Sequence, residues 1–190
     1  MKNNILLLTL FLCFSICQLT AQIWQYQPAI SQVQWTGKAA FDSYSLSGTL
    51  QLKTAELTMD AGEIAKGRFV FDMKTIDGEI KALTKHLKSK DFFEVKKYKE
   101  AVFDLTTISE DDKGQKMAEG QLTVKGKTQT IRFPITLSQQ ENQIAIKGAA
   151  QVNRTAYGIT YNSPSFFEKL QDKAIADEFT LNFDLVFVGN

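Results

Sequence analysis

The sequence repeats a pattern in which apolar and polar residues alternate, and this pattern constrains the fold more than any other feature. In the segment 66–75, Phe69, Phe71 and Met73 share one face while Arg68 lies on the other. A period of two residues is typical of β-strands that bury one face. The same pattern recurs in these further segments: 31–36, 46–52, 100–108, 119–125, 130–137, 144–152 and 178–188.

The segment 80–93 interrupts this alternation. Ile80, Leu83 and Leu87 have helical spacing and form one apolar stripe, and two aromatic residues, Phe92 and Phe93, follow them. A helix this short is marginal in water, and two adjacent rings need an apolar enclosure. We therefore expect a short helix that lies against the sheet as a plug.

Turn signals separate the alternating segments at regular intervals. The segments 60–62 and 125–127 predict hairpins, and Pro134 predicts an irregularity or an edge within its strand. Seven or eight antiparallel strands at this spacing predict a closed barrel or a sandwich. The long strands, the helical plug and a second irregular stretch at 154–173 favour a barrel with a mouth.

The first 21 residues differ from the rest of the chain. A short positive segment precedes a nearly unbroken apolar run at 5–19, and small residues precede Gln22. This pattern predicts a cleavable signal peptide, because the run is short for a membrane-spanning helix. We expect residues 1–21 to be the signal peptide and residues 22–190 to form one domain that is periplasmic or secreted.

Both cysteines, Cys13 and Cys17, lie in this leader, so the mature chain contains none. That excludes disulfides and cysteine chemistry from the mature chain. Without the leader, 21 Lys and Arg balance 21 Asp and Glu. Balanced charge argues against a nucleic-acid partner, and no later apolar stretch approaches membrane-spanning length. We expect no integral membrane segment in the mature chain.

His86 is the only histidine of the chain. A catalytic base needs a nucleophile and an orienting carboxylate within reach, and the sequence neighbours Ser89 and Asp91 do not form a triad by themselves. No carboxylate spacing resembles a calcium loop. We therefore expect no catalytic residues, no metal site and no cofactor.

The inward-facing set combines many phenylalanines with small residues such as Gly48, Gly148 and Ala150. An eight-stranded barrel of this composition can be filled by its side chains or can hold a small ligand. From these residues alone, a packed core is the favoured interpretation and a ligand pore the alternative.

Three motifs resemble those of the YceI-like family, in the same order. They occupy 83–98 with 101–103, 120–135, and 153–159, and the resemblance spans roughly 32–188. Two positions depart from the family pattern: Lys99 replaces a proline and Asn153 replaces an aspartate. The resemblance implies an exported, all-β fold, namely an eight-stranded antiparallel lipocalin-like barrel with a short helical plug.

The resemblance also implies non-catalytic binding, sequestration or transport of a long-chain amphiphile in the pore, such as an isoprenoid, a quinone-like lipid or a fatty-acid derivative. The alternative is a barrel with a packed interior that acts as a protein-interaction module in the envelope. Whether the protein forms a homodimer is left open. The motifs and the inward faces together give these expected ligand-binding residues: Phe69, Phe71, Met73, His86, Leu87, Phe92, Phe93, Phe103, Leu122, Phe133, Ile144, Arg154, Tyr157 and Phe183.

Overall fold

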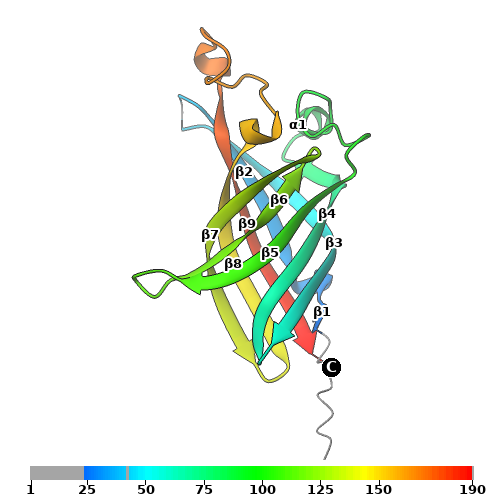
Figure 1. Cartoon of the computed structure of the whole chain (residues 1–190). Helices are drawn as coiled ribbons and strands as arrows, with labels where there is room; N and C mark the ends of the chain where they lie inside the picture. The colour runs from blue at the N-terminus through cyan, green and yellow to red at the C-terminus, as the bar shows by residue number, and fades with distance from the viewer. Residues whose placement is uncertain (1–23, 42, 190) are drawn as a thin grey trace, which may run out of the picture.

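The alternating segments form long antiparallel strands, as the sequence predicts (Figure 1). The computed structural model describes residues 24–41 and 43–189, so the predicted signal peptide lies outside the described residues. The elements are β1 (Trp24–Tyr26), η1 (Pro28–Ile30), β2 (Gln32–Ala39), β3 (Ser45–Asp60), β4 (Glu63–Gly78), α1 (Lys81–Leu87), β5 (Glu100–Glu110), β6 (Lys116–Val124), β7 (Lys127–Gln140), β8 (Gln143–Asn153), η2 (Arg154–Tyr157), η3 (Gln171–Lys173) and β9 (Ile175–Gly189).

Eight strands, β2 to β9, close into a barrel. Each of β2 to β8 pairs with the next in the chain, and β9 pairs with both β8 and β2, which closes the sheet. The short strand β1 also pairs with β9, at residues 187–189, which lie beyond the residue that pairs with the first residue of β2. The predicted barrel is therefore confirmed and the sandwich is wrong, whereas the sequence did not predict β1.

Each of the strands β2 to β9 extends beyond its predicted segment at one end or both, and in β3 and β5 bulges shift the alternation. In β3 the buried positions change from Leu50 and Leu52 to Ala55 at a register shift between Leu52 and Thr54. In β5 a similar shift follows Leu105. A bulge inserts one extra residue, so the inward face passes from one set of alternate positions to the other. The strand continues although the simple period ends.

Pro134 lies where β7 changes partner. Residues 127–134 of β7 pair with β6, and pairing with β8 begins at Ile135 opposite Gly148. Proline cannot donate to a ladder, so it suits a position where a strand leaves one neighbour and joins another. Each part of β7 therefore has a free edge on one side, which agrees with the predicted irregularity or edge at Pro134. The helix η2 contacts β7.

The strand β1 lies at the lower end of the barrel in Figure 1. Aromatic and aliphatic side chains are buried in the core there. Phe187 and Ile144 face each other across β8 and β9 and are fully buried. The ring of Phe187 lies 5.8 Å from that of Tyr26 and 6.5 Å from that of Phe69, measured between centroids. Trp24 is buried beside them in the same core. This end is closed by packing.

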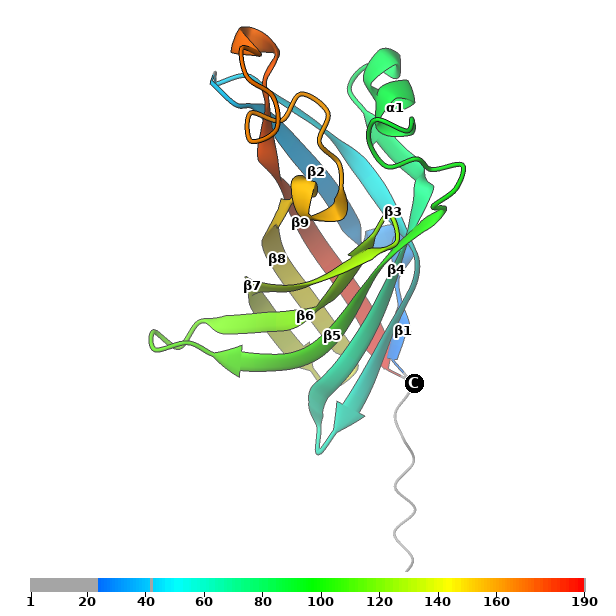
Figure 2. The same cartoon turned by 45° about the horizontal axis from the view of Figure 1, so that its top comes forward.

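The upper end carries α1 and the segment 154–174, which Figure 2 turns toward the viewer. Leu87 of α1 is buried, but Ile80 precedes the helix with an extended backbone and is 55% exposed, so its predicted inward position is wrong. Among residues 24–41 and 43–189, no helix is both long enough and apolar enough to cross a membrane.

Candidate ligand-binding cavities

Two cavities lie inside the barrel. The upper cavity, of about 100 Å³, is bordered by strand residues and by α1 and the segment 154–174, through Leu87 and Ile159 among others. The lower cavity, of about 60 Å³, is bordered by strand residues alone, including Phe103 and Phe133. Their linings are almost entirely apolar. Inward alternation on eight strands therefore leaves two apolar spaces within one hydrophobic core.

A ring of four side chains separates the two cavities. Phe71, Leu122, Val152 and Leu181 each border both spaces, and they come from β4, β6, β8 and β9. Because the same side chains form the floor of one cavity and the roof of the other, the cavities are stacked along the barrel. The two cavities therefore lie next to each other and share four lining residues.

Most of the sequence-predicted ligand residues border a cavity. Those at the upper cavity only are Met73, Leu87, Phe92, Phe93 and Arg154. Those at the lower cavity only are Phe69, Phe103, Phe133 and Phe183. Two more, Phe71 and Leu122, border both. Eleven of the fourteen predicted residues therefore line the two cavities, and their contact with a ligand stays a prediction.

Three predicted residues border neither cavity. Ile144 packs at the lower end, and Tyr157 is buried in η2. His86 lies on the outer side of the upper cavity lining: its ring centroid is 4.9 Å from that of Phe92 and 4.6 Å from that of Tyr161. His86 thus connects α1 with the segment 154–174.

Aromatic contacts run around the wall of the lower cavity. The ring centroids of Phe69 and Phe103 are 6.0 Å apart, those of Phe103 and Phe133 are 5.4 Å apart, and those of Phe133 and Phe183 are 5.7 Å apart. A Cβ at Gly148 would lie 2.5 Å from Cζ of Phe183, so the absent side chain makes room for that ring. The aromatic wall therefore requires a small residue in the adjacent strand.

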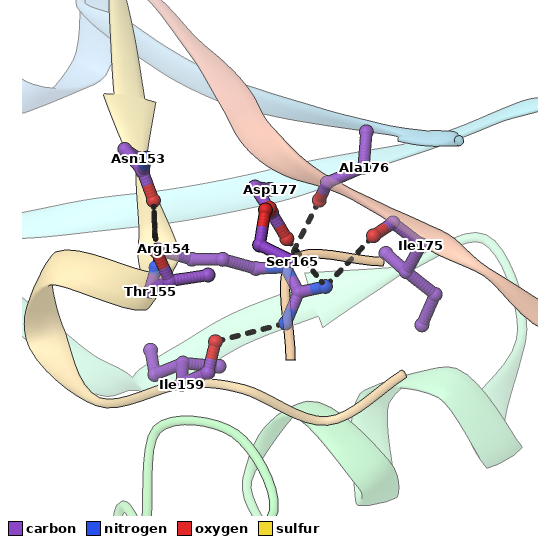
Figure 3. Close-up of polar contacts among 8 residues, drawn as sticks. All are labelled: Asn153, Arg154, Thr155, Ile159, Ser165, Ile175, Ala176 and Asp177. Carbon is purple, nitrogen blue, oxygen red and sulfur yellow. Dashed lines mark hydrogen bonds and ion pairs between the residues drawn. The ribbon is translucent and has the colours of Figure 1, made fainter. Parts of the chain in front are cut away.

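Arg154 joins the segment 154–174 to the start of β9, as Figure 3 shows. Its Nε donates to the carbonyl of Ala176 (2.9 Å), Nη1 to that of Ile159 (2.9 Å) and Nη2 to that of Ile175 (2.8 Å). The side chain is buried, and its guanidinium offers five donors in a rigid fork. Three backbone carbonyls that would otherwise lack partners are therefore satisfied by one residue.

Asp177 supplies the nearest negative charge. Its Oδ1 lies 3.6 Å from Nη2 of Arg154 and accepts no hydrogen bond from the described residues, while its Oδ2 accepts from the hydroxyl of Ser165 (Figure 3). Burial lowers the pKa of Arg154, and the charge of Asp177 acts in the opposite direction. Arg154 also borders the upper cavity, as Glu178 does, although the surface that lines this cavity is almost entirely apolar.

Two further polar residues shape this region. Asn153 caps η2, because its side-chain oxygen accepts from the amide of Thr155 (2.9 Å) and from its hydroxyl (2.6 Å). An amide oxygen serves as well as a carboxylate in such a cap, so this task needs no charge at position 153. The hydroxyl of Tyr157 has no partner among the described residues, and burial raises the pKa of Tyr157 to about 12.

Helix α1 is tied to the end of β4. The hydroxyl of Thr84 donates to Oδ1 of Asp77 (2.6 Å), and Nε1 of Trp35 donates to the carbonyl of Asp77 (2.9 Å). The hydrogen bond from Thr84 lowers the pKa of Asp77. Asp77 therefore holds α1, and with it Leu87, over the upper cavity.

The prediction from sequence left out several residues that border the upper cavity. Trp35 and Phe179 lie in the alternating segments 31–36 and 178–188 and were not included in the ligand-binding set, although their alternation could have placed them there. Ile159 and Ala176 come from or adjoin the irregular segment, where no periodic signal exists. In the part of the chain that the structure describes, no three His, Cys, Asp or Glu residues are grouped as a metal site.

Comparisons with known proteins agree with this architecture. The family model of the YceI-like domain matches residues 24–187. BcnA from Burkholderia cenocepacia has 23% identity and a TM-score of 0.70, covering 85% of this chain and 99% of that one. A polyisoprenoid binding domain from Saccharophagus degradans, implicated in plant cell wall breakdown, has 9% identity and a TM-score of 0.66, covering 88% of this chain and 98% of that one.

The YceI protein of Campylobacter jejuni has the same fold at lower similarity, with 18% identity, a TM-score of 0.57, and coverage of 74% of this chain and 84% of that one. No curated protein matches the sequence. At these identities the solved structures establish the fold, and the family model establishes the membership. This chain belongs to the YceI-like family.

Proposed function

We propose that this protein binds a long-chain amphiphile, such as an isoprenoid, a quinone-like lipid or a fatty-acid derivative, with its tail inside the barrel. Binding serves sequestration or transport outside the cytoplasm and involves no catalysis. The observation that carries this proposal is the pair of apolar cavities inside the barrel, whose linings share Phe71, Leu122, Val152 and Leu181. The fold shared with a polyisoprenoid binding domain supports the same class of ligand.

The tail enters from the mouth, which is the upper end of the barrel that carries α1 and the segment 154–174. It then passes the ring of Phe71, Leu122, Val152 and Leu181. The lower end is closed by packing around Phe187, so the tip of the tail stops above it. The polar end of the ligand remains in the upper cavity, which the charged residues Arg154 and Glu178 both border. All predicted ligand residues except His86, Ile144 and Tyr157 are contacts in this arrangement, and those three support the surrounding structure.

The energetics suit a chain of moderate length. Each buried methylene contributes about 0.8 kcal/mol, so about ten contribute roughly 8 kcal/mol. Several kcal/mol of this are lost when the ligand gives up its freedom of motion, which leaves an affinity nearer micromolar than picomolar. Each methylene that reaches the lower cavity adds to this sum, so affinity should increase with chain length until the barrel is full.

A series of prenyl alcohols of increasing length tests the proposal by titration calorimetry. Ala150 is buried and borders only the lower cavity, so Ala150→Leu fills that space. We expect this variant to bind short prenyl alcohols like the wild type and to lose at least about tenfold in affinity for the long ones, the equivalent of two or more methylenes. Ala149→Leu is the matched control, because Ala149 is the exposed neighbour on the outer face of β8.

Ala101→Leu supplies the reciprocal variant, because Ala101 is buried and borders only the upper cavity. We expect it to weaken the binding of short and long alcohols alike. An affinity of the wild type that does not change with chain length, or equal losses in Ala149→Leu and Ala150→Leu, would contradict the proposal and favour a packed barrel that acts as an interaction module.

A further inference from the structure

Large apolar side chains are exposed at the mouth of the barrel. Phe41 and Tyr44 lie in the connection between β2 and β3, and they are 73% and 59% exposed. Phe166 and Phe167 lie in the segment 154–174 and are 58% and 50% exposed. Aromatic side chains normally bury their surface, so a group of exposed ones marks an interaction site.

Backbone contacts place both groups at the same end of the barrel. The amide of Ala40 donates to the carbonyl of Ala174 (2.9 Å), which joins the β2–β3 connection to the segment 154–174. His86 and Tyr161, whose rings are 4.6 Å apart, join that segment to α1. Figures 1 and 2 show these three parts together above the strands. The exposed rings therefore surround the end at which the upper cavity lies.

The segment 81–99 adds positive charge at this end. It contains seven lysines and two acidic residues, whereas the whole chain has a net charge of only +1. Lys81, Lys85 and Lys96 are exposed, and within residues 24–41 and 43–189 none of the seven lysines forms an ion pair. The mouth thus combines exposed aromatic rings with an excess of lysine, while the rest of the chain is net negative.

We propose that the mouth docks on a bilayer surface that carries anionic lipid headgroups. Aromatic side chains prefer the headgroup level of a membrane, and each lysine near an anionic surface strengthens the attraction. The charge of the segment 81–99 complements such a surface. Docking orients the upper cavity toward the membrane, so an amphiphile exchanges between bilayer and barrel without crossing water. The docking itself goes beyond the proposed function and can be measured whether or not the barrel holds a lipid.

Sedimentation with vesicles measures this docking directly. The probe is a vesicle of phosphatidylcholine that contains about one third phosphatidylglycerol, an anionic lipid. The neutral control is a vesicle of phosphatidylcholine alone. We expect the chain from Gln22 onward to sediment with the anionic vesicles, to bind the neutral vesicles at least about tenfold more weakly, and to dissociate as salt screens the charges.

Two sets of variants separate the contributions. We expect Phe41→Ser/Phe166→Ser/Phe167→Ser to lower vesicle affinity at least about tenfold, because apolar area buried in the headgroup region is lost. Lys81→Glu/Lys85→Glu should remove most of the preference for anionic vesicles. The controls are Ile30→Ser, an equally exposed apolar residue in η1 at the lower end, and Lys66→Glu/Lys113→Glu, which changes the charge equally away from the mouth.

All the substituted side chains are exposed or lie in loops, so thermal melting should confirm that the variants remain folded. Absence of sedimentation of the wild-type chain with anionic vesicles would overturn the proposal. Equal losses in the mouth variants and in their controls would overturn it as well. If the mouth variants instead lost a protein ligand while vesicle binding stayed absent, the patch would be a protein interface and the membrane assignment would be wrong.

Discussion

The lower end of the barrel is closed by packed side chains, whereas the segments that cover the mouth are held by hydrogen bonds as well as by packing. Below, Phe187 and Ile144 are fully buried in the hydrophobic core, which Leu87 and Ile159 join from the mouth. Above, Arg154 and Asp77 fix the segment 154–174 and α1 through polar contacts to backbone and hydroxyl groups. Packing is lost only when the fold opens, but a few hydrogen bonds can break locally. The difference suits a barrel that is sealed at one end and accessible at the other.

The largest effect should come from the lower end. We expect Phe187→Ala to reduce the free energy of unfolding by about 4 kcal/mol, because it removes a fully buried ring that contacts Tyr26 and Phe69. Phe93→Ala, at the half-buried mouth, should cost about 2 kcal/mol or less. Denaturant titrations measure both values. Equal losses of unfolding free energy in Phe187→Ala and Phe93→Ala would contradict the proposed difference between the two ends.

Arg154→Met should lower the free energy of unfolding by about 3 kcal/mol, because three buried or part-buried backbone carbonyls lose their donor and Asp177 loses its cationic partner. The loss should be local, with faster hydrogen exchange in 159–177 and little change around Phe187. Arg154→Lys keeps the positive charge but loses the forked set of guanidinium donors. Its free energy of unfolding should therefore lie between those of the wild type and Arg154→Met. Uniformly faster exchange throughout the barrel would show that Arg154 stabilises the whole fold and does not act on the mouth alone.

Tyr157→Phe should raise the free energy of unfolding by about 1 kcal/mol, because it removes a buried hydroxyl without a partner. The wild type should show an alkaline effect as well. The pKa of Tyr157 rises from 10.0 to about 12 on folding, so full stability is present below pH 10 and is lost as the pH rises toward 12. Thermal melts between pH 8 and 12, compared with Tyr157→Phe, test this, and a parallel decline of both proteins would contradict it.

The smallest effect should be the acid sensitivity of α1. Hydrogen bonding lowers the pKa of Asp77 below its ordinary value of 3.8. The stabilisation is therefore present above pH 3.8 and is lost as the pH falls through the lowered pKa. Hydrogen exchange of α1 should accelerate over that range in the wild type, whereas Asp77→Asn should show faster exchange with no such pH dependence. Exchange that is unchanged in both proteins would mean that the contact with Thr84 does not hold the helix.

The strands were predictable from sequence because most of them bury one face. Phe69, Phe71, Met73 and Phe103 all point inward as their alternation indicates. The prediction stopped early in β3 because the bulge after Leu52 changes which positions face inward. The strand β1 was missed because three residues, Trp24–Tyr26, are too few to establish a period.

The site was predictable only in part, for a related reason. Inward strand residues such as Leu122 are recognisable from their period, and the residues of α1 and η2 came from the family resemblance. The role of Arg154 was not predictable, because its carbonyl partners at Ile175 and Ala176 are 21 and 22 residues away and are brought close only by the barrel. The residue Ile159 lines the upper cavity from an irregular segment, where sequence carries no periodic signal.

Native mass spectrometry of the mature protein, purified from its natural host without detergent, tests the central claim most directly. We expect a discrete additional mass that organic extraction removes and that analysis of the extract identifies as a long-chain amphiphile. We also expect Ala150→Leu to lose this mass while Ala149→Leu keeps it. A protein that carries no additional mass and that binds no prenyl alcohol of any length would contradict the account, and the barrel would then be a packed scaffold.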